Sequence, residues 1–368
     1  MQAPPLREVR GVIDAVELLL ALVRTPSPSG REGAVAELLA GWARRDGLVV
    51  EHDDAALRIT VEGRRPGPTL LLASHLDTVP AGEGWSVDPV LGVVDGDRLI
   101  ARGAADAKAS VAAMAAAAAR LAAAGGPASG RLVVLATYGE ETRDTTMPEA
   151  LRRLPWRPDG AVVGEPTSLQ PCIAQRGQLL LRLVWVGEQV HAGWAAGRLP
   201  RPTNAIEAAA HDLVRLGGLR LERTHAALGE VAVTPTMLQA GIARNVTPPR
   251  CEAVLDVRTT PAYSHAEVIE AVRGHLEHAT VEVISDRLVP AETPAGSRLL
   301  AAVRAVRPDA APFASPTCSD WVFLRDVDAV KLGPGDSRVS HTADEWVDLE
   351  EVRRGAALYA AVAEEYLR

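Results

Sequence analysis

A chain of 368 residues is longer than one ordinary hydrophobic core can organise, so we expect two domains or one domain with a large insertion. Its formal net charge of −8, without a dense run of lysine and arginine, argues against a surface that binds nucleic acid or an anionic membrane. With 47% hydrophobic and 23% charged residues the composition is that of a soluble globular protein, and small metabolites are the expected partners.

Cysteine usage and the first apolar segment bear on where the protein works. Cys172, Cys251 and Cys318 are far apart and form no CxxC pair, which indicates neither a disulfide framework nor a cysteine zinc site. The apolar segment 16–23 contains Glu17 and is too short to span a bilayer, so we interpret it as part of a core helix. Together these features favour a cytoplasmic protein without a membrane segment.

The beginning of the chain predicts two helices followed by two strands. A first helix is expected over about 11–24, and a second follows it with apolar residues at helical spacing. Ser29 and Glu32 match a capping box that would open the second helix. The strands are predicted at 48–52 and 57–61.

The apolar run 69–73 predicts a strand that is buried on both faces of an α/β sheet, and His75 and Asp77 follow at its end. Sheets of this kind bind ligands beyond the carboxyl ends of their strands. His75 could bind a metal while Asp77 accepts its other ring N–H and fixes the tautomer. A strand-end histidine that is merely hydrogen-bonded to a neighbouring carboxylate fits these residues equally well.

Acidic side chains follow further elements of this part of the chain. The predicted elements are a β-hairpin of strands 90–94 and 98–101 around Asp95-Gly96, an alanine-rich helix at about 108–124, and strands at 131–138 and 161–163. Asp106 lies in the small-residue loop before the helix, Glu140 and Glu141 follow one strand, and Glu165 follows the next. Loops over a rigid sheet are where such folds build sites, so we expect these side chains to share one.

The pattern changes at about residue 178 and changes back after 290. The predicted order in between is strand 178–186, helix 204–216, strand 230–240, strand 250–258, helix 264–278 and strand 280–284. This βαββαβ order is the ferredoxin-like signature. We therefore expect a discontinuous catalytic domain, 1–175 and 287–368, with a ferredoxin-like domain inserted at 176–286.

Eight short motifs occur in one order along the chain: SHLDTVP (74–80), RGAADAK (102–108), YGEET (138–142), VGEPTS (163–168), QVHAG (189–193), RNVTP (244–248), LDVR (255–258) and GPGDSRVSHTADE (333–345). Together they resemble the M20 metallopeptidase family, and within it the group of acetylornithine and acetylcitrulline deacetylases, succinyl-diaminopimelate desuccinylases and LysW-lysine hydrolases. The resemblance covers nearly the whole chain. It implies a mixed-sheet, three-layer α/β catalytic domain with an inserted ferredoxin-like dimerisation domain.

The resemblance implies a site for two divalent metal ions. The implied ligands are His75 and Glu165 for the first ion, Glu141 and His341 for the second, and Asp106 for both. Asp77 would orient His75, and the peptide bond between Asp106 and Ala107 would be cis. Histidine and carboxylate ligands suit zinc, and cobalt or manganese could substitute for it.

The resemblance also assigns roles to residues around the metals. Glu140, beside a ligand, would be the general acid and base. His191 would reach the active site of the partner subunit, in a homodimer formed through the inserted domains, and stabilise the oxyanion. Arg176 and Arg258 would clamp the substrate carboxylate, and Asn245 would support the same site. Each of these residues, taken singly, also fits an ordinary surface position.

The leading expectation is a dinuclear-metal amidohydrolase that removes a small acyl group from an amino acid, namely from N-acetylornithine or N-acetylcitrulline in arginine biosynthesis. Hydrolysis of a LysW-linked lysine or ornithine and desuccinylation of a diaminopimelate are the rival reactions. A catalytically silent dimeric binding protein on the same scaffold would be expected to lack a ligand or Glu140, and the sequence retains all of them. Neither GxGxxG nor GxSxG occurs, which argues against a nucleotide-dependent dehydrogenase and a serine hydrolase.

Overall fold

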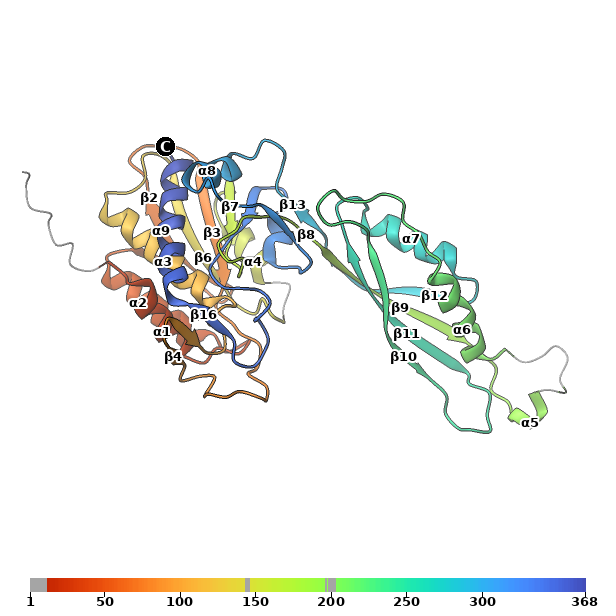
Figure 1. Ribbon diagram of the computed structural model, residues 1–368. Coiled ribbons are helices and arrows are strands. Elements are labelled where there is room, and N and C mark those ends of the chain that lie inside the picture. Colours follow the sequence, from red (N-terminus) through yellow and green to blue (C-terminus); the bar gives the residue numbers. More distant parts are fainter. Residues whose placement is uncertain (1–11, 143–145, 196, 198–202) are drawn as a thin grey trace, which may run out of the picture. The chain divides into compact units, whose positions relative to one another are not determined.

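The computed structural model describes residues 12–142, 146–195, 197 and 203–368, and these form two compact units (Figure 1). The described residues of the first unit lie within Met1–Ile173, Thr293–Phe313 and Ser319–Arg368, and those of the second lie within Ala174–Glu292 and Ala314–Cys318. The sequence predicts an inserted domain at 176–286. This range lies within the segment Ala174–Glu292 of the second unit. Among the described residues, no helix combines the length and the apolar character that crossing a membrane requires.

The first unit is organised by a mixed β-sheet. Its strands lie in the order β1 (Val49–His52), β2 (Ala56–Glu62), β6 (Arg131–Thr137), β3 (Thr69–His75), β7 (Gly160–Val163) and β15 (Asp328–Lys331), followed by Cys172 at the start of β8 (Cys172–Gln175). β1, β2 and β6 pair antiparallel, whereas β6, β3, β7 and β15 pair parallel. The predicted mixed α/β fold is confirmed. Because β6, β3 and β7 are parallel, the loops that follow them leave the same edge of the sheet.

Both faces of this sheet are covered, which gives three layers. Leu72 and Val134 join the core cluster that includes the buried residues of α1 (Ala15–Val23), α3 (Lys108–Ala123) and α9 (Leu349–Tyr366). Leu71 and Val133 alternate with them and are fully buried as well, so they lie under the opposite layer. β3 is buried along its whole length, as its apolar run predicts. The alanine-rich helix is also confirmed, and its small side chains let it contact α1, α9 and the sheet.

The remaining elements of the first unit flank this core. They are α2 (Gly33–Arg45), β4 (Val93–Asp95), β5 (Arg98–Ile100), β16 (Trp346–Asp348), α4 (Thr146–Arg153), α8 (Arg298–Val306) and the 3-10 helix η1 (Asp320–Leu324), with β14 (Phe313–Ser315) at its border. The predicted hairpin is confirmed, since β4 pairs antiparallel with β5 and Gly96 adopts a φ of 57° between them.

The predicted capping box of the second helix is wrong. α2 begins at Gly33, and its N-cap residue Glu32 makes no side-chain cap hydrogen bond. The Glu32 carboxylate instead accepts the N–H of Gly30 at 2.7 Å. The Ser29 hydroxyl donates to Oδ2 of Asp77 at 2.7 Å, because the stronger acceptor is a carboxylate that the fold brings from 48 residues away.

The second unit has the predicted βαββαβ order. Its elements are β9 (Gly177–Val186), the short α5 (Ala192–Ala195), α6 (Ala205–Leu216), β10 (Ala232–Ala240), β11 (Arg250–Thr259), α7 (His265–His275), β12 (Thr280–Leu288) and the two-residue β13 (Ala291–Glu292). The four long strands form an antiparallel sheet in the order β10-β11-β9-β12. Leu181 and Leu183 of β9 lie in one core with Val268 of α7, so the helices cover one face of the sheet.

Asp212 joins the helices of the second unit to each other. Its fully buried carboxylate accepts the indole N–H of Trp185 at 2.9 Å and the backbone N–H groups of Glu277, His278 and Ala279 at 3.0, 2.9 and 2.9 Å. Burial alone would raise the pKa of Asp212, but these hydrogen bonds lower it to about 2. The ionised carboxylate therefore stabilises the turn between α7 and β12.

We expect Asp212→Asn to lower the free energy of unfolding by at least ~2 kcal/mol at pH 7, because an amide replaces one of the two acceptor oxygens by an NH2 group and removes the negative charge. The contribution of a carboxylate with a lowered pKa is complete above its ordinary pKa of about 4 and is lost as the pH falls toward about 2. The difference from wild type, measured by urea unfolding, should therefore narrow below about pH 4. As control, Asp326→Asn changes a carboxylate that is 74% exposed and should have little effect. Equal stability of wild type and Asp212→Asn at pH 7 would contradict this role.

Candidate metal centre

The loops beyond one edge of the first sheet bring the predicted metal ligands together. His75 ends β3 and lies opposite Thr137 at the end of β6, after which Glu140 and Glu141 follow. Val163 ends β7 opposite Ala73 of β3, two residues before Glu165. Parallel pairing thus places three ligand-bearing loops side by side, as we expected from the strand ends.

Two groups of possible ligand atoms share one carboxylate. His75, Asp106 and Glu165 form one group and Asp106, Glu141 and His341 the other, and in each group the ligand atoms lie within 4.8 Å of one another. Nε2 of His75 lies 3.2 Å from Oδ1 of Asp106, and Nε2 of His341 lies 3.5 Å from Oδ2 of the same carboxylate. Nε2 of His341 is also 3.1 Å from the Glu141 carboxylate. The arrangement suits two neighbouring cations with Asp106 between them.

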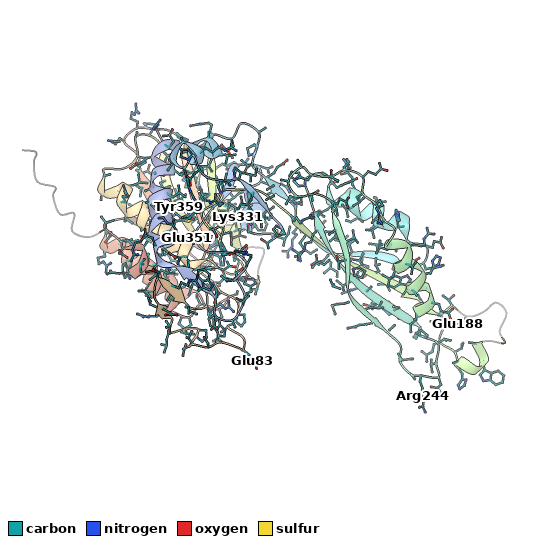
Figure 2. All side chains as sticks on the ribbon, in the orientation of Figure 1. Glu83, Glu188, Arg244, Lys331, Glu351 and Tyr359 are labelled. Atoms are coloured by element: carbon teal, nitrogen blue, oxygen red, sulfur yellow. The ribbon has the colours of Figure 1, made fainter. Side chains whose placement is uncertain are left out.

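The donor set and its electrostatics fit divalent metal ions. Imidazole nitrogens with carboxylate oxygens are typical zinc ligands. Burial and the charge of Asp106 raise the pKa of Glu165 to about 8, so the protein alone does not supply enough positive charge for these carboxylates. Lys331, labelled in Figure 2, is 3% exposed and only partly opposes this shift. Bound cations would remove the repulsion that raises this pKa.

Asp77 connects both sides of the centre. Nδ1 of His75 lies 3.0 Å from the backbone carbonyl oxygen of Asp77 and 3.4 Å from its Oδ1. The Asp77 carboxylate also accepts the N–H groups of Glu140 and Glu141 at 3.0 and 3.1 Å, in addition to the Ser29 hydroxyl. Burial alone would raise the pKa of Asp77, but the hydrogen bonds lower it to about 2. One carboxylate thus fixes His75 and the backbone that carries Glu141.

Glu345 holds the loop that carries Asp106. Its carboxylate is fully buried and accepts the N–H groups of Gly103, Ala105 and Asp106 at 3.1, 2.8 and 2.9 Å. It also accepts Nη1–H of Arg102 at 2.6 Å. Ser29 and Glu345 were not among the site residues predicted from the sequence. For Glu345, the one signal in the sequence was an acidic residue at the end of the last motif.

The backbone of the site loops adopts uncommon conformations. His341 has a φ of 63°, which is rare for a residue with a side chain and positions its ring beside Glu141. The Asp106–Ala107 peptide bond is cis, as the resemblance implies. At Gly333 any Cβ would overlap the Ser110 hydroxyl and the Glu165 carbonyl, so only glycine lets this loop approach Glu165 so closely.

Glu140 is set apart from the ligands. It belongs to neither ligand group of the described residues, although its backbone is held by the same carboxylate as that of Glu141. Burial raises the pKa of Glu140 well above its ordinary value. The charge of His75 acts to lower this pKa, and the charge of Asp320 acts to raise it. A carboxyl group that can hold a proton in this position suits proton transfer.

The other predicted site residues lie in the second unit, at opposite ends of its sheet. The His191 loop pairs with Val246, and the carbonyl of Asn245 accepts the N–H of Ala192 at 2.8 Å. This pair lies beyond the end of the sheet at which Val186 pairs with Arg250.

Arg176 and Arg258 lie at the other end of the sheet, where Gly177 pairs with Thr259. Arg176 donates to the carbonyls of Glu230 and Arg258 at 2.7 and 3.1 Å and to that of Leu228, and Arg258 donates to Asp256 at 2.7 and 3.0 Å. Because β9 has 10 residues, the two ends are roughly 30 Å apart. All four residues of one chain therefore cannot contact one small substrate.

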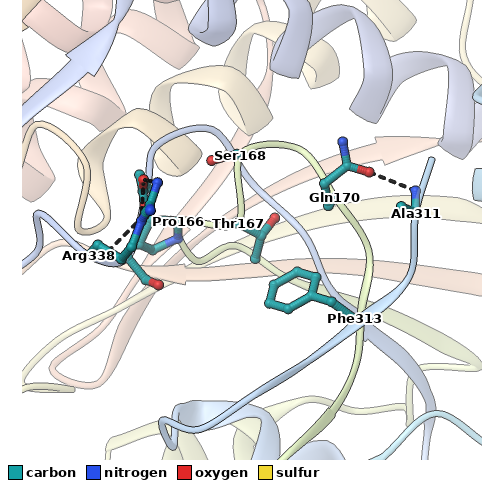
Figure 3. A pocket seen from close by; sticks show the side chains of 9 residues that line it. Pro166, Thr167, Ser168, Gln170, Ala311, Phe313 and Arg338 are labelled. Atoms are coloured by element: carbon teal, nitrogen blue, oxygen red, sulfur yellow. Dashed lines mark hydrogen bonds and ion pairs between the residues drawn. The ribbon is translucent and has the colours of Figure 1, made fainter. Parts of the chain in front are cut away.

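A pocket of about 440 Å³ lies beside the loop that follows Glu165 (Figure 3). It is lined by Pro166, Thr167, Ser168, Gln170, Ala311, Phe313, Asp336, Ser337 and Arg338. Figure 3 shows the Phe313 ring near Thr167. Nε of Arg338 donates to the Asp336 carboxylate at 2.9 Å. The pocket thus combines an apolar wall with a charged pair, on loops that continue into metal ligands.

Comparison with known proteins finds relatives that match nearly the whole chain. Residues 71–365 match the profile of the peptidase family M20/M25/M40. The chain is 28% identical to an acetylornithine deacetylase of Yersinia pseudotuberculosis, over 91% of this chain and 92% of the relative. It is 28% identical to a succinyl-diaminopimelate desuccinylase of Methylobacterium, over 95% of each chain. A putative LysW-lysine/LysW-ornithine hydrolase of Pyrobaculum aerophilum is 31% identical, over 96% of this chain and 98% of the relative.

Solved structures share the fold. The aminopeptidase PepT of Bacillus cereus matches with a TM-score of 0.81 and 20% identity, over 97% of this chain and all of that one. A Bacillus subtilis protein described as a dinuclear metal-binding peptidase of the M20 family matches with a TM-score of 0.72 and 16% identity, over 96% and 97% of the two chains. At these identities the likeness concerns the fold alone.

Proposed function

The chain belongs to the peptidase family M20/M25/M40, and we propose on this basis that it is a dinuclear-metal hydrolase that removes an N-acyl group from an amino acid. The observation that carries the proposal is the pair of ligand groups that share Asp106, with Glu140 beside them and outside both. His75 and Glu165 would hold one ion, and Glu141 and His341 the other. Zinc is the proposed metal, with cobalt or manganese as substitutes.

The residues of this chain divide the work of amide hydrolysis. When bound, the metal ions polarise the scissile carbonyl and lower the pKa of water toward ~7. Glu140 takes the proton from the attacking water and delivers it to the leaving amine, for which its raised pKa is suited. Asp77 keeps His75 and the Glu140–Glu141 backbone in place through its hydrogen bonds.

The reaction is proposed to take place in the cytoplasm.

The proposed substrate is N-acetylornithine or N-acetylcitrulline, in arginine biosynthesis. The Yersinia relative supports this choice, whereas the Pyrobaculum relative, at 31% identity, favours a lysine or ornithine linked to a LysW carrier. The Methylobacterium relative keeps succinyl-diaminopimelate as a third possibility.

The test is the kcat/KM of zinc-loaded protein on matched N-acetyl, N-succinyl and LysW-linked substrates. We expect the N-acetyl amino acids to be hydrolysed fastest. A higher kcat/KM for either other class would reassign the substrate, and hydrolysis of none would contradict the proposed deacylase.

His191 is proposed to act across a homodimer formed through the inserted domains. The separation within the second unit supports this, because His191 and Asn245 lie roughly 30 Å from Arg176 and Arg258 of the same chain. In the proposed dimer, each site combines Glu140 of one chain with His191 of the other. His191 would stabilise the oxyanion, a contribution of about 10²–10³ in kcat.

This arrangement predicts complementation between two inactive variants. Glu140→Ala and His191→Ala homodimers should each be nearly inactive, but subunit exchange should restore activity. Each mixed dimer then contains one site with both residues intact, because Glu140 and His191 of that site come from different chains. The measurement is turnover after exchange of differently tagged subunits.

Isolated mixed dimers serve to show that exchange has taken place. Activity that stays at the level of the parent homodimers would exclude action of His191 across the dimer. The metal chemistry of the first unit would be unaffected by that result.

A further inference from the structure

A second group of potential metal ligands lies in the second unit, away from every residue assigned to the hydrolase. His211 and Asp212 are on α6, and His278 lies in the turn between α7 and β12. One ligand atom from each of the three residues lies within 4.8 Å of the others. Both histidine side chains are about half exposed, at 48% and 49%, so an ion from solvent can reach them.

One carboxylate oxygen of Asp212, Oδ1, accepts fewer hydrogen bonds than the other and can still bind a cation. Oδ2 of Asp212 accepts the N–H groups of Trp185, His278 and Ala279, whereas Oδ1 accepts only that of Glu277. Nδ1 of His211 lies 3.5 Å from Oδ1, which is long for a hydrogen bond. A nitrogen and an oxygen at this separation can both be ligands of one zinc ion, which binds each at about 2.0–2.2 Å.

Hydrogen bonds hold the three ligands in place. Asp212 binds the backbone of His278 and its neighbours, so the turn that carries His278 is fixed against the helix that carries His211. The two imidazole rings lie with their centroids 5.3 Å apart. Because these hydrogen bonds hold the backbone that carries the ligands, the exposed rings need only rotate to bind an ion.

The carboxylate of Glu277 lies near the imidazole rings of both His211 and His278. Its Oε2 lies 3.8 Å from Nε2 of His211 and 4.0 Å from Nε2 of His278. Arg215 binds the other oxygen, Oε1, at 2.8 Å and so fixes the carboxylate. At these distances the carboxylate makes no hydrogen bond to either ring, but its negative charge favours a cation beside them.

We propose that His211, Asp212 and His278 bind a zinc ion at the surface of the second unit, where it joins α6 to the turn between α7 and β12. Two imidazole nitrogens and one carboxylate oxygen are a typical three-ligand set for zinc, and water can occupy the fourth position. The ion would be separate from the two in the hydrolase centre. It would stabilise the packing of the helices on the sheet of the second unit.

The test uses the full-length enzyme with both hydrolase metals loaded. Zinc alone is titrated into wild type, the double variant His211→Ala/His278→Ala and the control His275→Ala, and binding is followed by calorimetry. His275 is a matched control because it lies close in sequence and Nδ1 of its ring binds the carbonyl of Ala271 at 3.0 Å. Thermal unfolding with and without added zinc gives a second readout.

We expect wild type and His275→Ala to bind one additional zinc ion per chain and to gain thermal stability from it. The double variant should bind that ion more than about 100-fold more weakly and gain no stability, while its kcat with both hydrolase metals loaded is unchanged. Zinc binding of equal strength in the double variant, or equal loss in His275→Ala, would overturn the proposal. Absence of additional binding to wild type would overturn it as well.

Discussion

Removing divalent metal ions by chelation should abolish amide hydrolysis, and about two equivalents of zinc or cobalt per chain should restore it. The reason lies in the centre itself, where His75, Glu165, Glu141, His341 and the shared Asp106 form two adjacent ligand groups. The expected loss is complete, because without the ions nothing in the two ligand groups lowers the pKa of the attacking water. The measurement is turnover against metal content, in the His211→Ala/His278→Ala background so that only the hydrolase ions are counted.

Two substitutions make this prediction specific to the shared carboxylate. Asp106→Asn should impair binding of both ions, whereas His341→Ala should impair binding of only one, because Asp106 alone belongs to both groups. Turnover that persists in protein shown to be free of metal would contradict the mechanism. Loss of only one ion from Asp106→Asn would contradict the sharing of this residue.

Glu140→Gln should lower kcat by about 10²–10⁴-fold while the protein keeps its metal ions. The amide is nearly the same size as the carboxyl group but cannot take a proton from water. The Glu140 backbone N–H still binds Asp77, so the neighbouring ligand Glu141 keeps its place. The measurement is kcat together with metal content at saturating zinc.

Glu141→Gln is the matched control, since the two residues are adjacent and the chemical change is identical. It should lower metal content as well as kcat, because Glu141 belongs to a ligand group. The reverse outcome, with metal lost from Glu140→Gln and kept by Glu141→Gln, would mean that the two roles have to be exchanged.

The sequence predicts this fold well where burial alone determines structure. The run before His75 is apolar throughout because β3 is buried on both faces, and the alternation in β9 and β11 follows a sheet with one covered face. Once β6, β3 and β7 are known to be parallel, the ends of these strands must meet at one edge. The proximity of His75, Glu141 and Glu165 follows from that topology.

The supporting contacts of the site could not be predicted in this way. The Ser29 and Asp77 side chains meet across 48 residues, and Glu345 binds the N–H of Asp106 across 239 residues. Such contacts depend on the register of loops, which no periodic pattern encodes. The local pattern at Ser29 even favoured a capping box, and a tertiary hydrogen bond to a buried carboxylate replaced it.

Short elements were missed for a related reason. α4 has 8 residues and β8 has 4, which is too few to establish a period that distinguishes helix from strand. The roles proposed for Arg176 and Arg258 stay predictions, and in the structure both guanidinium groups bind acceptors of the second unit. Binding of a substrate carboxylate by Arg258 would compete with Asp256.

The central claim is that two metal ions bind on either side of Asp106, and anomalous scattering from crystals of the zinc-loaded enzyme tests it most directly. Data collected on both sides of the zinc absorption edge locate each ion without assumptions about its ligands. Besides the separate peak expected at His211, Asp212 and His278, we expect two peaks about 3.5–4 Å apart in the hydrolase centre, one beside His75 and Glu165 and the other beside Glu141 and His341, with Asp106 between them. A single peak in this centre, or two peaks there that do not share Asp106, would contradict the account.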